Sequence, residues 1–132
     1  MKKLLSTISL SLALLSPTLH AQQTPTEKLS LEQSILCMKA NAPAKWDALV
    51  SWVDRSNPQQ ITVNALAHIA GTPIDKTVPF NVCDAETQAH ALLGLTTLIP
   101  KNESMWKTLL VRIDDKGNYS VLTDISMARA NK

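Results

Sequence analysis

Apolar and polar residues alternate along two stretches of the C-terminal third, and a period of two is typical of half-buried β-strands. In the first stretch, the apolar residues that share a face are Leu109, Val111 and Ile113. In the second, the residues that share a face are Tyr119, Val121, Thr123 and Ile125. Residues 114–118 join the two stretches, and Gly117 can adopt the left-handed conformation that a short hairpin loop requires. The pattern therefore predicts a C-terminal β-hairpin.

Apolar residues recur every three to four positions in the N-terminal part, which predicts two helices. Residues 30–33 (Ser-Leu-Glu-Gln) match a capping box, so the first helix is expected to begin at Ser30. Pro43 suits the first turn of a second helix, which should end near Asn57. The apolar stripe of that second helix is Trp46, Leu49, Val50 and Val53. Trp52 lies off the stripe, so its indole is expected to stay accessible when the helix packs.

The middle of the chain gives weaker signals. Residues 61–69 alternate as a strand does and begin with β-branched residues, although they also fit a helical stripe; we favour a strand. Residues 78–82 alternate again and predict a second short strand. Asp84 is a favoured N-cap for a helix over residues 85–93. The pattern leaves residues 88–99 open between helix and strand.

Together these elements predict an α+β fold, in which an N-terminal helical pair packs on an antiparallel sheet that ends in the C-terminal hairpin. The length is that of a single domain. We expect this domain to span residues 30–126 and the tail at residues 127–132 to fray.

The N-terminus has the parts of a cleavable secretory signal in the expected order. Residues 2–3 are lysines, and residues 4–15 are apolar apart from Ser and Thr. We expect cleavage after Ala21, which makes residues 1–21 a signal peptide and residues 22–29 a flexible leader. The apolar run is too short to span a bilayer. An exported, periplasmic protein that does not associate with the membrane after cleavage is therefore predicted.

Signal cleavage changes the charge of the chain. The full sequence has 13 Lys and Arg against 11 Asp and Glu. Because Lys2 and Lys3 leave with the signal, the mature chain is neutral, with 13 − 2 = 11 basic residues against the same 11 acidic ones. Without a basic cluster, neither nucleic acid nor an anionic membrane surface is expected as a partner.

Export to an oxidising compartment favours a disulfide between the two cysteines, Cys37 and Cys83. They are 46 positions apart, and loop-closure entropy assigns such a bridge about 4 kcal/mol of stabilisation. The alternative makes one cysteine a nucleophile with His90 as its base, but no other residue marks such a site. We therefore predict a structural disulfide.

The candidates for chemistry are few. Neither His68 nor His90 has the spacing of a metal-binding pair, and no glycine-rich phosphate loop or nucleophile elbow occurs. No catalytic residue, metal or cofactor is therefore predicted. Tryptophan is enriched at the energetic centres of protein interfaces, so Trp52 and Trp106 are the candidate partner-binding residues.

These observations favour an exported, non-enzymatic domain that binds another envelope or exported protein, of the inhibitor, toxin-immunity or assembly-factor kind. One alternative is a small periplasmic hydrolase or metal-dependent enzyme that uses His68, His90 or an unpaired cysteine. A second alternative is a periplasmic chaperone that exposes apolar surface under acid stress.

Overall fold

The computed structural model describes residues 25–130. The predicted signal peptide and the first residues of the leader lie outside this range. In chain order the main elements are α3 (Pro25–Lys39), β2 (Trp46–Asn57), β3 (Gln60–Ile69), β4 (Thr77–Pro79), α4 (Ala85–Leu93), β5 (Thr108–Asp114), β6 (Tyr119–Thr123) and α5 (Asp124–Ala130). The connection from α4 to β5 contains two short 3₁₀-helices, Thr96–Leu98 and Lys101–Glu103. None of the helices within this range combines the length and hydrophobicity needed to cross a membrane.

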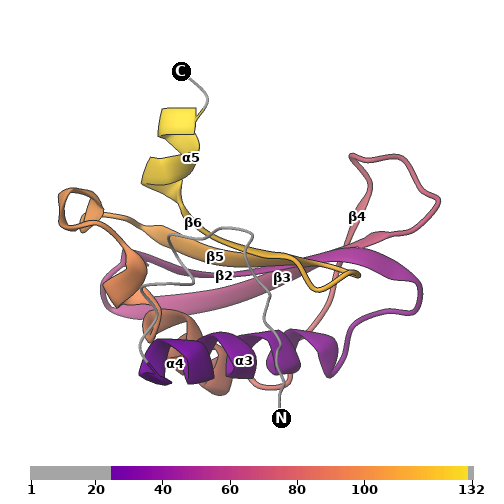
Figure 1. Ribbon diagram of the computed structural model, residues 1–132, viewed down its shortest axis with the longest axis horizontal. Coiled ribbons are helices and arrows are strands. Elements are labelled where there is room, and N and C mark those ends of the chain that lie inside the picture. Colours follow the sequence, from indigo (N-terminus) through magenta and orange to yellow (C-terminus); the bar gives the residue numbers. More distant parts are fainter. Residues whose placement is uncertain (1–24, 131–132) are drawn as a thin grey trace, which may run out of the picture.

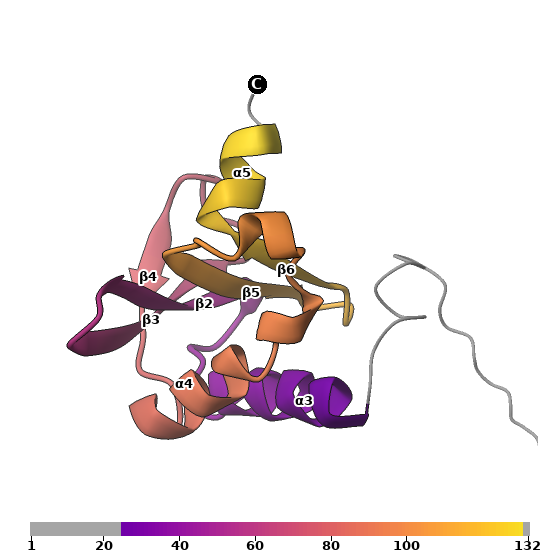
Figure 2. The same cartoon turned by 90° about the vertical axis from the view of Figure 1, so that its left-hand side faces the viewer.

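The five strands form one antiparallel sheet in the order β4-β3-β2-β5-β6. Helices α3 and α4 lie side by side on one face of it (Figures 1 and 2). We call this covered side the inner face and the opposite side the outer face. The predicted α+β class, with helices packed on an antiparallel sheet and a C-terminal strand hairpin, is confirmed.

Residues 46–57 form the central strand β2, so the prediction of a second helix from Pro43 to Asn57 is wrong. The positions buried on the inner face are Leu49, Ser51 and Val53. Ser51 can be buried because its hydroxyl donates a hydrogen bond of 2.9 Å to the carbonyl oxygen of Asn64 on β3. This serine interrupts the apolar alternation, which left the helical spacing as the stronger local signal. The second helix of the pair is α4, from the middle of the chain.

The hydrophobic core lies between the inner face and the helices. Its buried residues from the sheet are Leu49, Val53, Ala67, Leu109, Val111 and Ile113. The helices and the α4–β5 connection contribute Leu31, Met38, Leu92, Leu95 and Trp106. The alternate positions that predicted strand β5 are therefore those that pack under the helices.

Helix α3 begins at Pro25, five residues before the predicted start, so the capping box at residues 30–33 is not used. Proline is favoured in the first turn of a helix. Ser30 instead lies inside α3 and faces α4: a Cβ placed on Gly94 would collide with the Ser30 hydroxyl. Gly94, at the end of α4, thus permits the close approach of the two helices.

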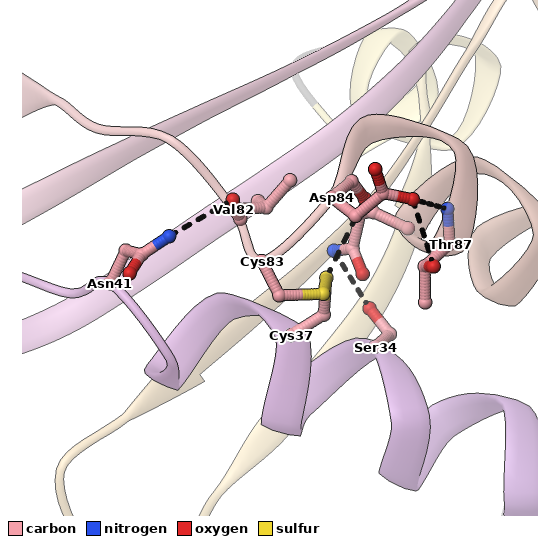
Figure 3. Close-up of a disulfide and its surroundings, with 8 residues drawn as sticks. Ser34, Cys37, Asn41, Val82, Cys83, Asp84 and Thr87 are labelled. Atoms are coloured by element: carbon pink, nitrogen blue, oxygen red, sulfur yellow. Dashed lines mark hydrogen bonds between the residues drawn. A yellow bond between two sulfur atoms is a disulfide. The ribbon is translucent and has the colours of Figure 1, made fainter.

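The predicted disulfide between Cys37 and Cys83 is present (Figure 3). It joins the last turn of α3 to the residue just before the N-cap of α4. The backbone N–H of Cys83 also donates to the carbonyl oxygen of Cys37 at 2.9 Å. Asp84 caps α4 as predicted, accepting hydrogen bonds of 2.9 Å from the N–H and the hydroxyl of Thr87. These bonds hold the pKa of Asp84 below its ordinary value.

The β5–β6 hairpin closes through a turn organised by Asp114. Its carboxylate accepts hydrogen bonds from the backbone N–H of Lys116 at 2.8 Å and from the backbone and side-chain N–H of Asn118, both at 2.9 Å. These bonds lower the pKa of Asp114. Gly117 has a φ of 91°, the left-handed conformation expected from the sequence.

Asp124–Ala130 form helix α5, so regular structure extends into the predicted tail at residues 127–132, of which residues 131–132 lie outside the described range. The Asp124 carboxylate accepts from the backbone N–H of Lys107 and Thr108, at 2.9 and 3.1 Å. Arg129 forms an ion pair with Glu103, which is buried. Ile125, predicted to continue the face of β6, instead packs on the core from α5.

Candidate functional site

The outer face of the sheet lies opposite the helical layer. In Figure 1, α5 and the β3–β4 connection rise from its two ends. Strand alternation places five half-buried apolar side chains there: Val50, Trp52, Leu66, Leu110 and Leu122. They are continuous across four strands, since Val50 pairs with Leu66, Trp52 pairs with Leu110, and Leu110 pairs with Leu122. We call these five residues the apolar strip.

A cavity of about 450 Å³ opens at one end of the strip, between the β3–β4 connection and the β5–β6 turn. Its apolar lining includes Ala48, Val50, Leu66 and Ile74. Ile74, in the β3–β4 connection, is 92% exposed. The polar lining consists of Asp47, His68, Thr77, Arg112, Asp114, Asp115 and Lys116. The site thus combines an apolar floor with a charged rim.

His68 ties the β3–β4 connection to β2. Its Nδ1 lies 2.6 Å from an oxygen of Asp47, and its Nε2 lies 2.9 Å from the carbonyl oxygen of Pro73. A carbonyl oxygen and a carboxylate can only accept, so both bonds form together when both ring nitrogens carry a proton. The hydrogen bond to Asp47 and then that to Pro73 raise the pKa of His68. With both nitrogens donating, His68 has no lone pair to act as a base.

We expect the His68 bonds to make the β3–β4 connection sensitive to pH. Because the pKa of His68 is raised in the folded state, its contribution to stability is complete below the ordinary value of 6.5 and is lost as pH rises through the folded-state pKa. Above that pKa only one ring nitrogen carries a proton, and because the Asp47 carboxylate is the stronger acceptor, we expect the bond to Pro73 to be the one that is lost. NMR titration of the His68 ring, with amide protection factors for residues 70–76, should therefore show loosening of the connection at the pH where His68 titrates.

Two variants control this pH experiment. His68→Gln should remove the pH dependence of protection in residues 70–76, whereas His90→Gln should leave it intact, because His90 is exposed on α4. Protection factors that stay constant while His68 titrates would show that the bond to Pro73 does not hold the connection.

The structure does not bring the two histidines together, since His68 is on the outer face and His90 on the helical layer. Within residues 25–130, no group of three or more His, Cys, Asp or Glu side chains could hold a metal ion. Both cysteines are in the disulfide. The alternative with an unpaired cysteine is therefore contradicted.

The two candidate tryptophans lie in different environments. Trp52 is half-buried on the outer face, at the centre of the apolar strip. Trp106 is 1% exposed and part of the core. The Arg55 guanidinium lies 3.5 Å from the centre of the Trp106 ring and donates hydrogen bonds of 2.6 Å to the carbonyl oxygens of Trp106 and Ser104. Of these two tryptophans, Trp52 alone keeps part of its side chain at the surface.

Sequence reasoning missed Arg112 and the Asp47–His68 pair. Strand alternation puts Arg112 on the outer face, between Val50 on β2 and Ser120 on β6. One signal was available in the sequence. Between the core positions of β5 lie Leu110 and Arg112, so the face of the strand opposite the core carries one apolar and one charged side chain. That signal becomes informative only once the neighbouring strands are known.

No protein-family model matches the chain, and no curated protein matches it either.

Proposed function

We propose that this domain is an exported, non-enzymatic module that binds another envelope or exported protein on the outer face of its sheet, with Trp52 as the anchor. The observation that carries the proposal is the apolar strip, five half-buried side chains on the face opposite the helices. Contiguous apolar surface with a polar rim is the composition of a protein interface. A partner of the inhibitor, toxin-immunity or assembly-factor kind fits this role.

Trp52 is the largest side chain in the strip and is half-buried. It lies between Asn64 on β3 and Leu110 on β5, with Val50 two positions along its own strand. A large aromatic side chain surrounded by smaller apolar ones is the usual arrangement of an interface hot spot. Covering this ring with a partner would remove its apolar surface from water and contribute to binding.

The enzyme alternative has little support from the described side chains. The ring nitrogens of His68 both face acceptors, His90 is exposed on the helical layer, and both cysteines are in the disulfide. The acid-stress alternative needs acid to expose apolar surface. His68 acts in the opposite direction, because its hydrogen bonds to Asp47 and Pro73 raise its pKa and its protonation therefore favours the folded state. Binding to a protein therefore remains the better-supported function.

Export remains part of the proposal. The Cys37–Cys83 disulfide supports it, because such bridges persist in oxidising compartments such as the bacterial periplasm. The predicted cleavage after Ala21 supplies the route. Intact-mass measurement of the mature protein would test both features together.

Site-specific photo-crosslinking in cells tests where the partner binds. A photoreactive phenylalanine derivative in place of Trp52 should crosslink one protein in stoichiometric yield. The matched control carries the same group in place of Leu36, which is 68% exposed on α3 on the helical side. Crosslinking of the same protein from position 36 but not from position 52 would contradict binding on the outer face.

Trp52→Ala should weaken binding of the partner identified in this way by roughly 30-fold, or about 2 kcal/mol. Leu36→Ala should leave the affinity unchanged, because Leu36 lies on the other layer. Titration calorimetry with the purified partner gives both values, and circular dichroism establishes that each variant is folded. Equal affinity of wild type and Trp52→Ala would remove Trp52 as the anchor.

A further inference from the structure

The cavity at the β3–β4 end of the outer face contains a cation that the fold leaves unpaired. Arg112 lines this cavity from the middle of β5 and is exposed. No ion pair or hydrogen bond joins its side chain to another residue of the described range 25–130. An arginine guanidinium offers several N–H donors in a planar fork that matches a carboxylate. Arg112 therefore presents an unused recognition group beside an apolar floor.

The neighbouring carboxylates are mostly engaged elsewhere. Asp114, two positions along β5, accepts three hydrogen bonds within the hairpin turn. Asp47 is bonded to His68. The charge of Lys116 acts on Asp114, and Asp115, at the rim, is the remaining acidic side chain of the cavity. The fold thus supplies no internal partner for Arg112, and a single negative charge from outside would fit better than a dense acidic run, which Asp115 would repel.

The residues around Arg112 indicate which chemical group lies next to the carboxylate of the ligand. Val50 is its cross-strand neighbour, and Leu66 and Ile74 line the same cavity. These side chains favour an aliphatic group next to the carboxylate. The apolar surface continues past the cavity to Trp52, Leu110 and Leu122, so the occupant is longer than a small metabolite. An extended polypeptide segment satisfies both conditions.

We infer that the cavity binds an Asp or Glu side chain of the partner's segment, flanked by aliphatic residues, with Arg112 as its receptor. The inference rests on the proposed function, because it identifies what the outer face recognises in its partner. The aliphatic neighbours of the acidic residue would contact Val50, Leu66 and Ile74, and the following part of the segment would reach Trp52. The partner's binding segment therefore has one Asp or Glu with aliphatic residues on either side of it.

Selection from random octapeptides with both ends blocked tests this inference, using the intact domain. The enriched peptides should carry one Asp or Glu beside an aliphatic residue. Changing that residue to its amide should weaken binding to the wild type about tenfold. Arg112→Gln should weaken binding of the acidic peptide by a similar factor and abolish the difference between acid and amide. Lys101→Gln, at an exposed cation in the α4–β5 connection, is the matched control and should change nothing.

The outcomes separate the two proposals. Peptides without an acidic residue, or peptides whose affinity is unaffected by Arg112→Gln, would overturn the carboxylate inference. If such peptides still lose affinity with Trp52→Ala, the outer face remains the binding surface. A second library of the same peptides with free C-termini is selected in parallel. If only this library yields binders, Arg112 recognises a terminal carboxylate, and the inference of a side-chain carboxylate is overturned. A library that yields no binder would overturn the recognition of a short segment, and the crosslinking experiment would then decide the function independently.

Discussion

Replacing Cys37 and Cys83 together by Ala is expected to lower the free energy of unfolding by up to about 4 kcal/mol. The bridge closes a loop of 46 residues, so its loss frees a large number of conformations in the unfolded chain. It also holds the end of α3 against the start of α4, where the Cys83 N–H donates to the Cys37 carbonyl. A loss of this size is a large part of the stability of a small domain.

Urea unfolding measures this loss. The double variant should also unfold with a steeper dependence on urea, because the unfolded chain without the bridge is less compact and exposes more surface. Reduction of the wild type should reproduce the loss, and the same reductant should not affect the variant. An unchanged midpoint after removal of both cysteines would show that the helix contacts hold this region without the bridge.

Trp106→Ala is expected to cost about 3 to 5 kcal/mol of folding stability, the range typical of removing a buried Trp or Phe side chain. Trp106 is 1% exposed and packs in the core between the sheet and the helices. Its loss would also leave the Arg55 guanidinium without the ring on which it lies. Both effects act on the α4–β5 connection, which Arg55 holds through the carbonyl oxygens of Trp106 and Ser104.

Denaturant unfolding of three variants tests this prediction by comparing their losses of folding stability. Trp106→Phe keeps part of the buried volume, so its loss should fall well below that of Trp106→Ala. Trp52→Ala should destabilise much less than Trp106→Ala, because Trp52 keeps part of its surface in water. Equal losses from Trp52→Ala and Trp106→Ala would mean that Trp52 is a structural residue and that the partner binds elsewhere.

Local signals in the sequence were sufficient for several elements. The alternation of residues 109–113 and 119–123, with Gly117 between them, predicted the hairpin because neighbouring strands joined by a short turn need few distant contacts. Asp84 and residues 85–93 predicted α4, since a cap acts on the residues next to it. The disulfide was predicted from there being two cysteines in a chain with a predicted export signal.

Strand β2 shows where local signals fail. Trp46, Leu49, Val50 and Val53 fit a helical stripe, and the buried Ser51 interrupts the apolar alternation that would have indicated a strand. A buried serine is acceptable in a central strand only if its hydroxyl has a partner, and that partner is the carbonyl of Asn64 on β3. Trp52 was expected to be accessible on a helix, and it is half-buried on the outer face of a strand instead. Trp52 is still a candidate partner-binding residue, but because it lies on the outer face of the sheet and not because it lies off a helical stripe.

By itself, the sequence determined the α+β class, the hairpin, α4 and the disulfide, and it singled out Trp52. Only the tertiary structure decided that residues 46–57 are the central strand, that Trp106 is core, and that Arg112 shares an outer face with Val50 and Leu66. The physical reason is the range of the interactions. Caps, turns and alternation act over a few residues. The neighbours of Arg112 instead depend on the pairing of β2 with the distant strand β5, and the bond between Asp47 and His68 depends on the register along the whole β2–β3 hairpin.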